Sequence, residues 1–378
     1  MAKLDVNIYE HDQEAQWLLA VADQVVRDNP VAPESIDPQY KKLVPGILAG
    51  HVAIIGAPQM GKSTAILHAS SKLRLPARIF TCRHGMRPSD VLGKFVPNSH
   101  KGVEGDEREF VFAPGPLIDM FEKGGIFAAN EMFSLYPDES QVFMPFLDET
   151  PYYEVDDGAG QKAKIKRHPN FRFVCTGNPH TQSAKDQDEA LASRFNTVLY
   201  LSDAGLPQNT FIMMCKRKWP EINNEFFKAS FTLCKAIENT ASEDYNVMGV
   251  SCGIRQLTGL IGHLYSEGSK ITKDNFALDV QVTLYNALGL ARIPYDEISK
   301  IRLQDVNKTC VNIMFQEWNA SMAASQAKDG KGPSEAPLSA PTPPDGSSPE
   351  TKTMEAAIKD GLDMVGSLLN ADPKDLLS

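Results

Sequence analysis

Short apolar runs alternate with helical stretches along the middle of this 378-residue chain. Strands that alternate with helices are typical of a mostly parallel sheet covered by helices on both faces. We therefore predict an α/β domain over residues 45–204. The runs predicted to be its strands are residues 51–55, 77–82, 125–129, 171–176 and 197–201.

The regions on either side of this domain are predicted to be helical. In the N-terminal segment, residues 1–44, apolar positions recur at helical spacing before the stop signal Asn29-Pro30, which predicts one amphipathic helix. These positions are Trp17, Leu18, Val21 and Val25. Residues 205–320 contain no convincing strand and predict a second, helical domain. Its helices are expected near residues 208–219, 222–239, 253–267, 274–291 and 295–318.

The composition changes after this helical domain. Residues 321–353 are rich in Ser, Ala, Pro and Gly and lack aromatic residues, which predicts a disordered linker. Helical spacing returns in residues 354–378, where Met354, Ile358, Leu362, Val365 and Leu369 would share one face. This last segment is either an amphipathic turn without a role or a tethered helix that docks on a partner or a neighbouring subunit.

The net charge, the lack of long apolar runs and the spacing of the cysteines each disfavour some classes of protein. The formal net charge is −10, which argues against a general nucleic-acid binder. The N-terminus has no apolar signal core, and no run approaches the length of a membrane span. The six cysteines are scattered without paired metal-ligand spacing. We interpret them as reduced thiols and expect a cytoplasmic protein.

The sequence GAPQMGKST follows the first predicted strand and has the spacing of a P-loop. Its glycines let main-chain N–H groups face phosphates, and the start of the following helix favours an anion. Lys62 can reach the β- and γ-phosphates, and the Ser63 hydroxyl can ligate Mg²⁺. The alternative is a structural glycine-rich turn. The residues predicted to cradle the nucleotide are Gly56, Ala57, Pro58, Gln59, Met60, Gly61, Lys62, Ser63 and Thr64.

The third predicted strand ends in Asn130-Glu131, where P-loop ATPases usually have Asp-Glu. A second acidic pair, Asp148-Glu149, also follows apolar residues, but Pro145 argues against a central strand there and we place that pair at a helix end. Asn130 keeps an oxygen for the metal shell and loses a charge, whereas Glu131 can still polarise water. The sequence thus predicts Ser63 and Asn130 as metal ligands. The sequence is compatible with an ATPase that hydrolyses ATP normally, and also with one that hydrolyses it slowly or only binds it.

Three later residues are candidates for the same site. Asn178, after the fourth strand, could reach the γ-phosphate or the attacking water, although Gly-Asn-Pro is also a common turn. Arg194 precedes the fifth strand and could serve a neighbouring subunit as an arginine finger, or it could be a surface residue. Ser251 is expected to cap a helix whose first turn carries Arg255. Arg255 could contact the nucleotide from above, or it could be solvated.

Together these motifs resemble AAA+ ATPases of the MoxR type, including the CbbQ/NorQ activators, over residues 35–320. GAPQMGKST resembles their Walker A motif, GGIFAANEM their Walker B, FVCTGNP sensor 1, EALASRF the arginine-finger segment and GIRQL sensor 2. Residues 89–93 with 112–117 resemble an inserted hairpin region, and residues 152–166 a hairpin before sensor 1. Asn130 departs from the family, which has Asp at this position.

The resemblance implies a ring, expected to be a hexamer, with ATP and Mg²⁺ at subunit boundaries. It implies ATP hydrolysis that remodels, assembles or activates a protein client, as a chaperone does, with a possible von Willebrand factor A domain partner. Glu131, Asn178, Arg194 and Arg255 would be the catalytic residues. Two other functions stay open: a nucleotide-gated binding ring with little hydrolysis, and a nucleic-acid motor. The acidic balance disfavours the motor, and the sensor-2-like helix disfavours a small-molecule kinase.

Overall fold

The protein is described here from a computed structural model. The described residues are 4, 6–98, 110–148, 150–156, 162–178, 193–202, 205–245, 250–267, 271–290, 293–302 and 304–329. Residues up to Lys328 form one compact unit. The predictions of a tail helix at 354–378 and of a linker beyond residue 329 fall outside the described residues.

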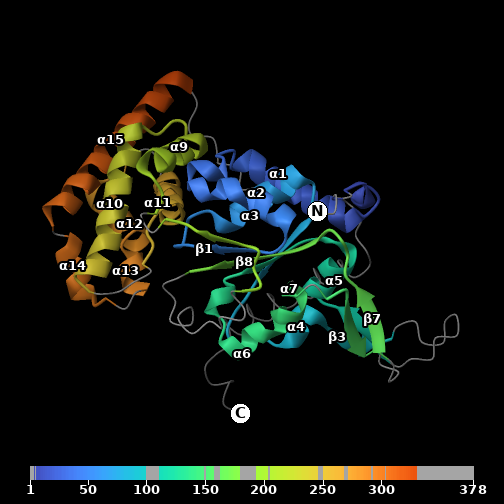
Figure 1. Ribbon diagram of the computed structural model, residues 1–378. Coiled ribbons are helices and arrows are strands. Elements are labelled where there is room, and N and C mark those ends of the chain that lie inside the picture. The colour runs from blue at the N-terminus through green and yellow to red at the C-terminus, as the bar shows by residue number, and fades with distance from the viewer. Residues whose placement is uncertain are drawn as a thin grey trace, which may run out of the picture. The chain divides into compact units, whose positions relative to one another are not determined.

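A parallel sheet forms the centre of the α/β domain (Figure 1). Its strand order is β2-β5-β8-β1-β9, and each neighbouring pair is parallel. The five strands predicted from the sequence are therefore confirmed, with ends shifted by at most one residue. Their bounds are β1 Val52–Ile55, β2 Ala77–Thr81, β5 Gly125–Asn130, β8 Phe171–Gly177 and β9 Thr197–Tyr200.

Helices cover both faces of this sheet, as predicted (Figure 1). Successive strand residues point to opposite faces, so Ile54 and Val174 join one core while Phe127 and Phe173 join the other. Because both faces of the sheet are buried, the sequences of its strands are nearly continuous apolar runs. The helices of the first face are α1 Gln13–Asp28, α2 Leu43–Ala49 and α3 Lys62–Leu73; those of the second are α4 Pro88–Leu92, α5 Pro116–Lys123, α6 Pro137–Ser140 and α7 Met144–Leu147.

The predicted N-terminal helix is α1, but its buried face differs from the predicted one. Ala15, Leu19 and Ala22 are buried, whereas the side chain of Trp17 is 54% exposed. Small residues at positions 15 and 22 suit the packing of α1 against α3. Helical spacing alone could not decide between these two adjacent faces.

Two antiparallel strand pairs extend from the α/β domain. Strands β3 Gly93–Pro97 and β4 Phe110–Pro114 form one pair, in the region expected to hold an insert. Strands β6 Tyr152–Asp156 and β7 Lys162–Lys166 form the other, which confirms the hairpin predicted over residues 152–166. Residues 99–109 and 157–161 lie outside the described part of the chain.

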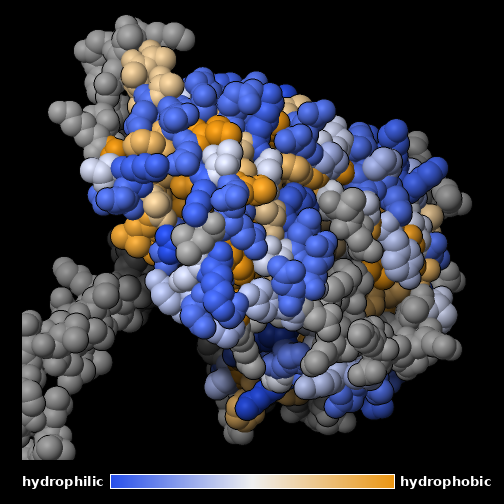
Figure 2. Space-filling view, turned by 90° about the vertical axis from the view of Figure 1, so that its left-hand side faces the viewer, coloured by the Kyte–Doolittle hydropathy of each residue, from blue (hydrophilic) through white to orange (hydrophobic). Residues whose placement is uncertain are grey.

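The region after β9 is helical, as predicted, and has its own core around Phe226, Phe227, Phe276 and Trp318. On the face shown in Figure 2, its apolar surface residues are interspersed among hydrophilic ones. Among the described residues, no helix is both long and apolar enough to cross a membrane. The helices are α9 Gln208–Lys218, α10 Asn224–Glu243, α11 Ile254–Glu267, α12 Lys273–Thr283, α13 Asn286–Leu290, α14 Tyr295–Arg302 and α15 Asp305–Asp329.

Three predicted boundaries in this region are wrong. The helix expected at 274–291 is broken between α12 and α13, where Leu284 and Tyr285 are buried. The helix expected at 295–318 is broken between α14 and α15, where the Asn307 side chain donates to the Ile301 carbonyl at 2.8 Å and satisfies a helix-end acceptor. Finally, α15 continues past residue 321, the predicted start of the linker. Ser321 is 1% exposed and its hydroxyl accepts the Asn223 N–H at 2.9 Å.

Candidate nucleotide-binding site

The GAPQMGKST sequence forms the turn between β1 and α3, as the P-loop prediction requires. Gly61 has φ +70°, the left-handed region that favours glycine. A Cβ on Gly56 would lie 2.7 Å from the Leu201 side chain, so the main chain passes too close for a larger residue. Helix α3 then begins at Lys62. The main-chain N–H groups at this helix start form a ready anion site.

Lys62 lies at the base of this turn, and only 7% of its surface is exposed to solvent. Its Nζ donates to the carbonyl oxygens of Gly56 at 2.7 Å and Ala57 at 2.9 Å. Burial lowers the pKa of Lys62, because the charged form loses water, while the Glu131 carboxylate acts in the opposite direction. A bound phosphate would replace the two neutral acceptors with anionic oxygens and strengthen these bonds.

Asn130 ends strand β5 and points its side-chain oxygen at the P-loop helix. This Oδ1 accepts the Ser63 hydroxyl at 3.1 Å and the Thr176 hydroxyl at 2.8 Å. The prediction that Asn130-Glu131 closes a sheet strand is confirmed. The alternative pair is excluded, because Asp148 follows the short helix α7; Glu149 lies outside the described residues.

Thr176 is a site residue that the sequence reasoning missed. It is fully buried on β8, and its hydroxyl donates to Asn130 while accepting the Glu131 N–H at 3.1 Å. Glu131 itself has φ +58°, an uncommon conformation for a residue with a side chain. Thr176 therefore fixes both residues of the pair. The only sequence signal was its place near the end of a strand, and its partner depends on the β5–β8 register, which pairs Ala129 with Cys175.

The P-loop faces a pocket of about 720 Å³ that also includes the start of α11. This volume lies within the range of small-molecule sites. The pocket brings together the predicted residues Lys62, Ser63, Glu131 and Arg255. Its lining consists of residues 58–64, Asn130, Glu131, Met214, Val250, Ser251, Ile254, Arg255, Gln256 and Ala287.

Arg255 is on the first turn of α11 and exposed to this pocket. Among the described residues, no hydrogen bond or ion pair engages its guanidinium group. The predicted cap Ser251 is wrong. Gly253 occupies the cap position, because its carbonyl accepts the Leu257 N–H at 2.9 Å and its own N–H donates to Gln256 Oε1 at 3.1 Å. The bond from the Gly253 N–H to Gln256 is one of the two hydrogen bonds of a capping box, the one from the N-cap main chain to the side chain three residues later.

Asn178 and Arg194 do not line this pocket. Asn178 follows β8 and is half-buried. The Arg194 Nε donates to Asp148 Oδ1 at 2.7 Å, so within its own chain the guanidinium pairs with the residue after α7. Residues 179–192, which include most of the predicted arginine-finger segment, lie outside the described residues.

The side chains beside the P-loop offer the type of ligand atom that Mg²⁺ prefers. Ser63 Oγ and Asn130 Oδ1 are hard oxygen atoms 3.1 Å apart beside the predicted phosphate cradle. The mismatch is charge, because Asn130 is a neutral amide where carboxylate is the preferred protein ligand.

The fold is an α/β P-loop fold of the AAA+ type, with a parallel sheet and a C-terminal helical region. In agreement, residues 51–195 match the sequence model of the family described as AAA domain (dynein-related subfamily). No curated protein matches the chain. Among solved structures, a "putative ATPase" from Cytophaga hutchinsonii ATCC 33406 is 14% identical over 83% of this chain and 98% of that chain, with a TM-score of 0.38.

Proposed function

We propose that this protein is an AAA+ ATPase that binds ATP with Mg²⁺ between the P-loop and α11. One observation carries the proposal: Lys62, Ser63, Glu131 and Arg255, which are up to 193 positions apart in sequence, line a single pocket. Two cations, a hydroxyl and a carboxylate around a P-loop are the groups that phosphoryl transfer to water needs. A structural glycine turn would not require this assembly.

Each of these residues has a distinct part in the proposed reaction. Lys62 and the P-loop N–H groups bind the phosphates, and Ser63 and Asn130 would hold Mg²⁺. The metal, when bound, would neutralise phosphate charge. Glu131 orients the attacking water, and Thr176 holds Glu131 through its main-chain N–H. Arg255 would contact the nucleotide from the helical region, while Asn178 would act near the γ-phosphate.

We further propose that subunits assemble into a ring, expected to be a hexamer, in which Arg194 completes a neighbour's site. This is supported by the position of Arg194 away from its own pocket. For this role the Arg194 guanidinium would exchange or share its bond with Asp148. The side chain of Arg194 is 28% exposed, and that of Asp148 is 46% exposed. Water can reach both side chains of this pair, so the contribution of the pair to stability is modest.

The work done by this ring is proposed to be remodelling or activation of a protein client, in the cytoplasm, with a von Willebrand factor A domain protein as one expected partner. Both strand pairs offer exposed aromatic side chains for such contacts: Phe95 is 45%, Phe110 47% and Tyr152 40% exposed. Aromatic side chains are enriched at protein interfaces. All six cysteines, each within the described residues, are free thiols.

The experiment measures Mg²⁺-dependent ATP turnover and particle size together. Wild type is expected to hydrolyse ATP and to assemble when ATP is added. Glu131→Gln is expected to lower turnover about 100-fold by removing the group that orients water. Lys62→Ala is expected to abolish it, while Lys72→Ala, an exposed lysine on the same helix, serves as the matched control. Equal turnover in wild type and Glu131→Gln would refute the assignment.

A second function, a nucleotide-gated binding ring with little hydrolysis, is favoured by Asn130 alone. Its neutral amide would bind Mg²⁺ less firmly than a carboxylate. ATP-driven assembly without measurable turnover in wild type, and turnover restored by Asn130→Asp, would support this alternative. Measurable wild-type turnover that Asn130→Asp leaves unchanged would exclude it.

A further inference from the structure

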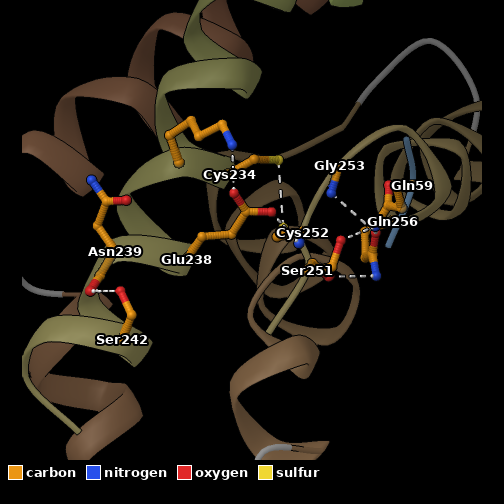
Figure 3. Close-up of polar contacts among 10 residues, drawn as sticks. Gln59, Cys234, Glu238, Asn239, Ser242, Ser251, Cys252, Gly253 and Gln256 are labelled. Carbon is orange, nitrogen blue, oxygen red and sulfur yellow. Dashed lines mark hydrogen bonds and ion pairs between the residues drawn. The ribbon is translucent and has the colours of Figure 1, made fainter. Parts of the chain in front are cut away.

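Gln59 has an unusual conformation for a residue with a side chain. Its φ of +63° lies in the left-handed region, which glycine adopts without strain. Its side chain leaves the P-loop and reaches the segment before α11, 192 positions away in sequence (Figure 3). A residue kept in a disfavoured backbone conformation needs surrounding contacts to hold it there. Here those contacts come from the helical region.

Both N–H groups of the Gln59 amide are used. Nε2 donates to Ser251 Oγ at 2.8 Å and to Gln256 Oε1 at 2.9 Å. The orientation of these amides is determined by the main chain: the Gly253 N–H can only donate, so Gln256 must present Oε1, and Gln59 must then present its NH₂ group. Nε2 of the Gln256 amide donates to the Ser251 carbonyl oxygen at 3.1 Å.

Gly253 leaves the space that Gln59 occupies. A Cβ at position 253 would lie 2.5 Å from Gln59 Oε1, well inside contact distance. On its other side this segment is held by α10, because Glu238 Oε1 accepts the Cys252 N–H at 2.9 Å (Figure 3). The cap of α11 is therefore fixed from the P-loop and from the helical core together.

Arg255 lies between the residues that Gln59 holds. Ser251 and Gln256 flank it in sequence, and all three line the pocket with Gln59. We propose that Gln59 is a positioning residue: it ties the P-loop to the first turn of α11 and thereby places the Arg255 guanidinium over the bound nucleotide. This inference rests on the proposed ATP site. Gln59 would thereby link the position of the first turn of α11 to the conformation of the P-loop.

A double-mutant cycle on the affinity for ATP tests this proposal directly. Binding is measured by calorimetry on the full chain for wild type, Gln59→Gly, Arg255→Ala and the double variant. Gln59→Gly is expected to bind ATP about threefold to tenfold more weakly than wild type, as for the loss of about one net hydrogen bond. In the Arg255→Ala background, the same change should have no further effect. Gly253→Ala should reproduce the Gln59→Gly loss, because the added methyl group displaces the amide.

Arg74→Gly is the matched control. Arg74 also has a left-handed φ, of +54°, but it ends α3 away from the pocket, so the change should leave ATP affinity unaltered. Hydrogen exchange in nucleotide-free protein adds a second readout, with faster exchange expected at residues 253–257 in Gln59→Gly and not in Arg74→Gly. An equal loss of affinity from Gln59→Gly with and without Arg255, or no loss at all, overturns the positioning role. Failure of wild type to bind ATP instead overturns the proposed function, and this inference with it.

Discussion

Replacing Thr176 by valine removes a hydroxyl while keeping the shape of the side chain. In the structure this hydroxyl is fully buried and makes two hydrogen bonds, to Asn130 Oδ1 at 2.8 Å and from the Glu131 N–H at 3.1 Å. Valine makes neither. Asn130 Oδ1 keeps its bond from Ser63, whereas the Glu131 N–H loses the only partner that the structure shows for it among the described residues.

The expected cost follows from these partners. A buried polar group left without a hydrogen bond costs about 1–3 kcal/mol. The Glu131 N–H should incur most of this cost and Asn130 less, so we expect Thr176→Val to lower the free energy of unfolding by about 2–3 kcal/mol. Thr176→Ser keeps the hydroxyl and loses one methyl group, which should cost only about 1 kcal/mol.

Urea unfolding of nucleotide-free protein measures both changes, with the midpoint shifted and the slope unchanged. The same two proteins are then compared in ATP turnover. Thr176→Val should lose activity, because Glu131 is no longer held in its left-handed conformation, and Thr176→Ser should retain most of it. A free energy of unfolding for Thr176→Val within about 0.5 kcal/mol of wild type, a change typical of surface sites, would show that this hydroxyl has no such role. Equal damage from serine and valine would show the same.

Other predictions address pH, the metal, the ring and the helical boundary. Burial, with Arg167 and Arg172 nearby, lowers the pKa of His51 to about 3. Below about pH 6.5 the unfolded chain takes up a proton that the native protein does not, so stability should fall as pH falls toward 3, by at most about 1.4 kcal/mol per unit. Urea unfolding at pH 5 and 7 should show this slope in wild type and lose it in His51→Asn. Asn130→Asp should lower the Mg²⁺ concentration for half-maximal turnover, seen by titration. Wild-type turnover per chain should rise with protein concentration, whereas Arg194→Ala should show no such rise and Arg217→Ala should resemble wild type. Ser321→Ala should cost about 1 kcal/mol in urea unfolding, through the Asn223 N–H; no cost would contradict the extended α15.

Much of the fold could be predicted because its signals are local. Each sheet strand is a continuous apolar run, since both faces of the sheet are buried. Pro145 placed Asp148 outside the sheet, and the P-loop spacing located the turn between β1 and α3. The break between α14 and α15 was missed, because it depends on the Asn307 side chain reaching a carbonyl six residues back.

The candidate site was predicted in part, for a related reason. Lys62, Ser63, Asn130 and Glu131 belong to motifs that can be recognised along the chain. Thr176 could not be found this way, because its partners are set by how β5 and β8 align. The side-chain contacts of Gln59 depend on two segments 192 positions apart meeting across the pocket. Such contacts depend on tertiary packing, which no short stretch of sequence encodes alone.

Calorimetric titration of ATP with Mg²⁺ into the purified chain measures whether the pocket between the P-loop and α11 binds ATP. We expect wild type to bind one ATP per chain. Lys62→Ala should bind ATP at least about tenfold more weakly, because charged hydrogen bonds are lost, and Lys72→Ala should keep the affinity of wild type. No heat of binding from wild type, or the same affinity in Lys62→Ala, would contradict binding of ATP in this pocket.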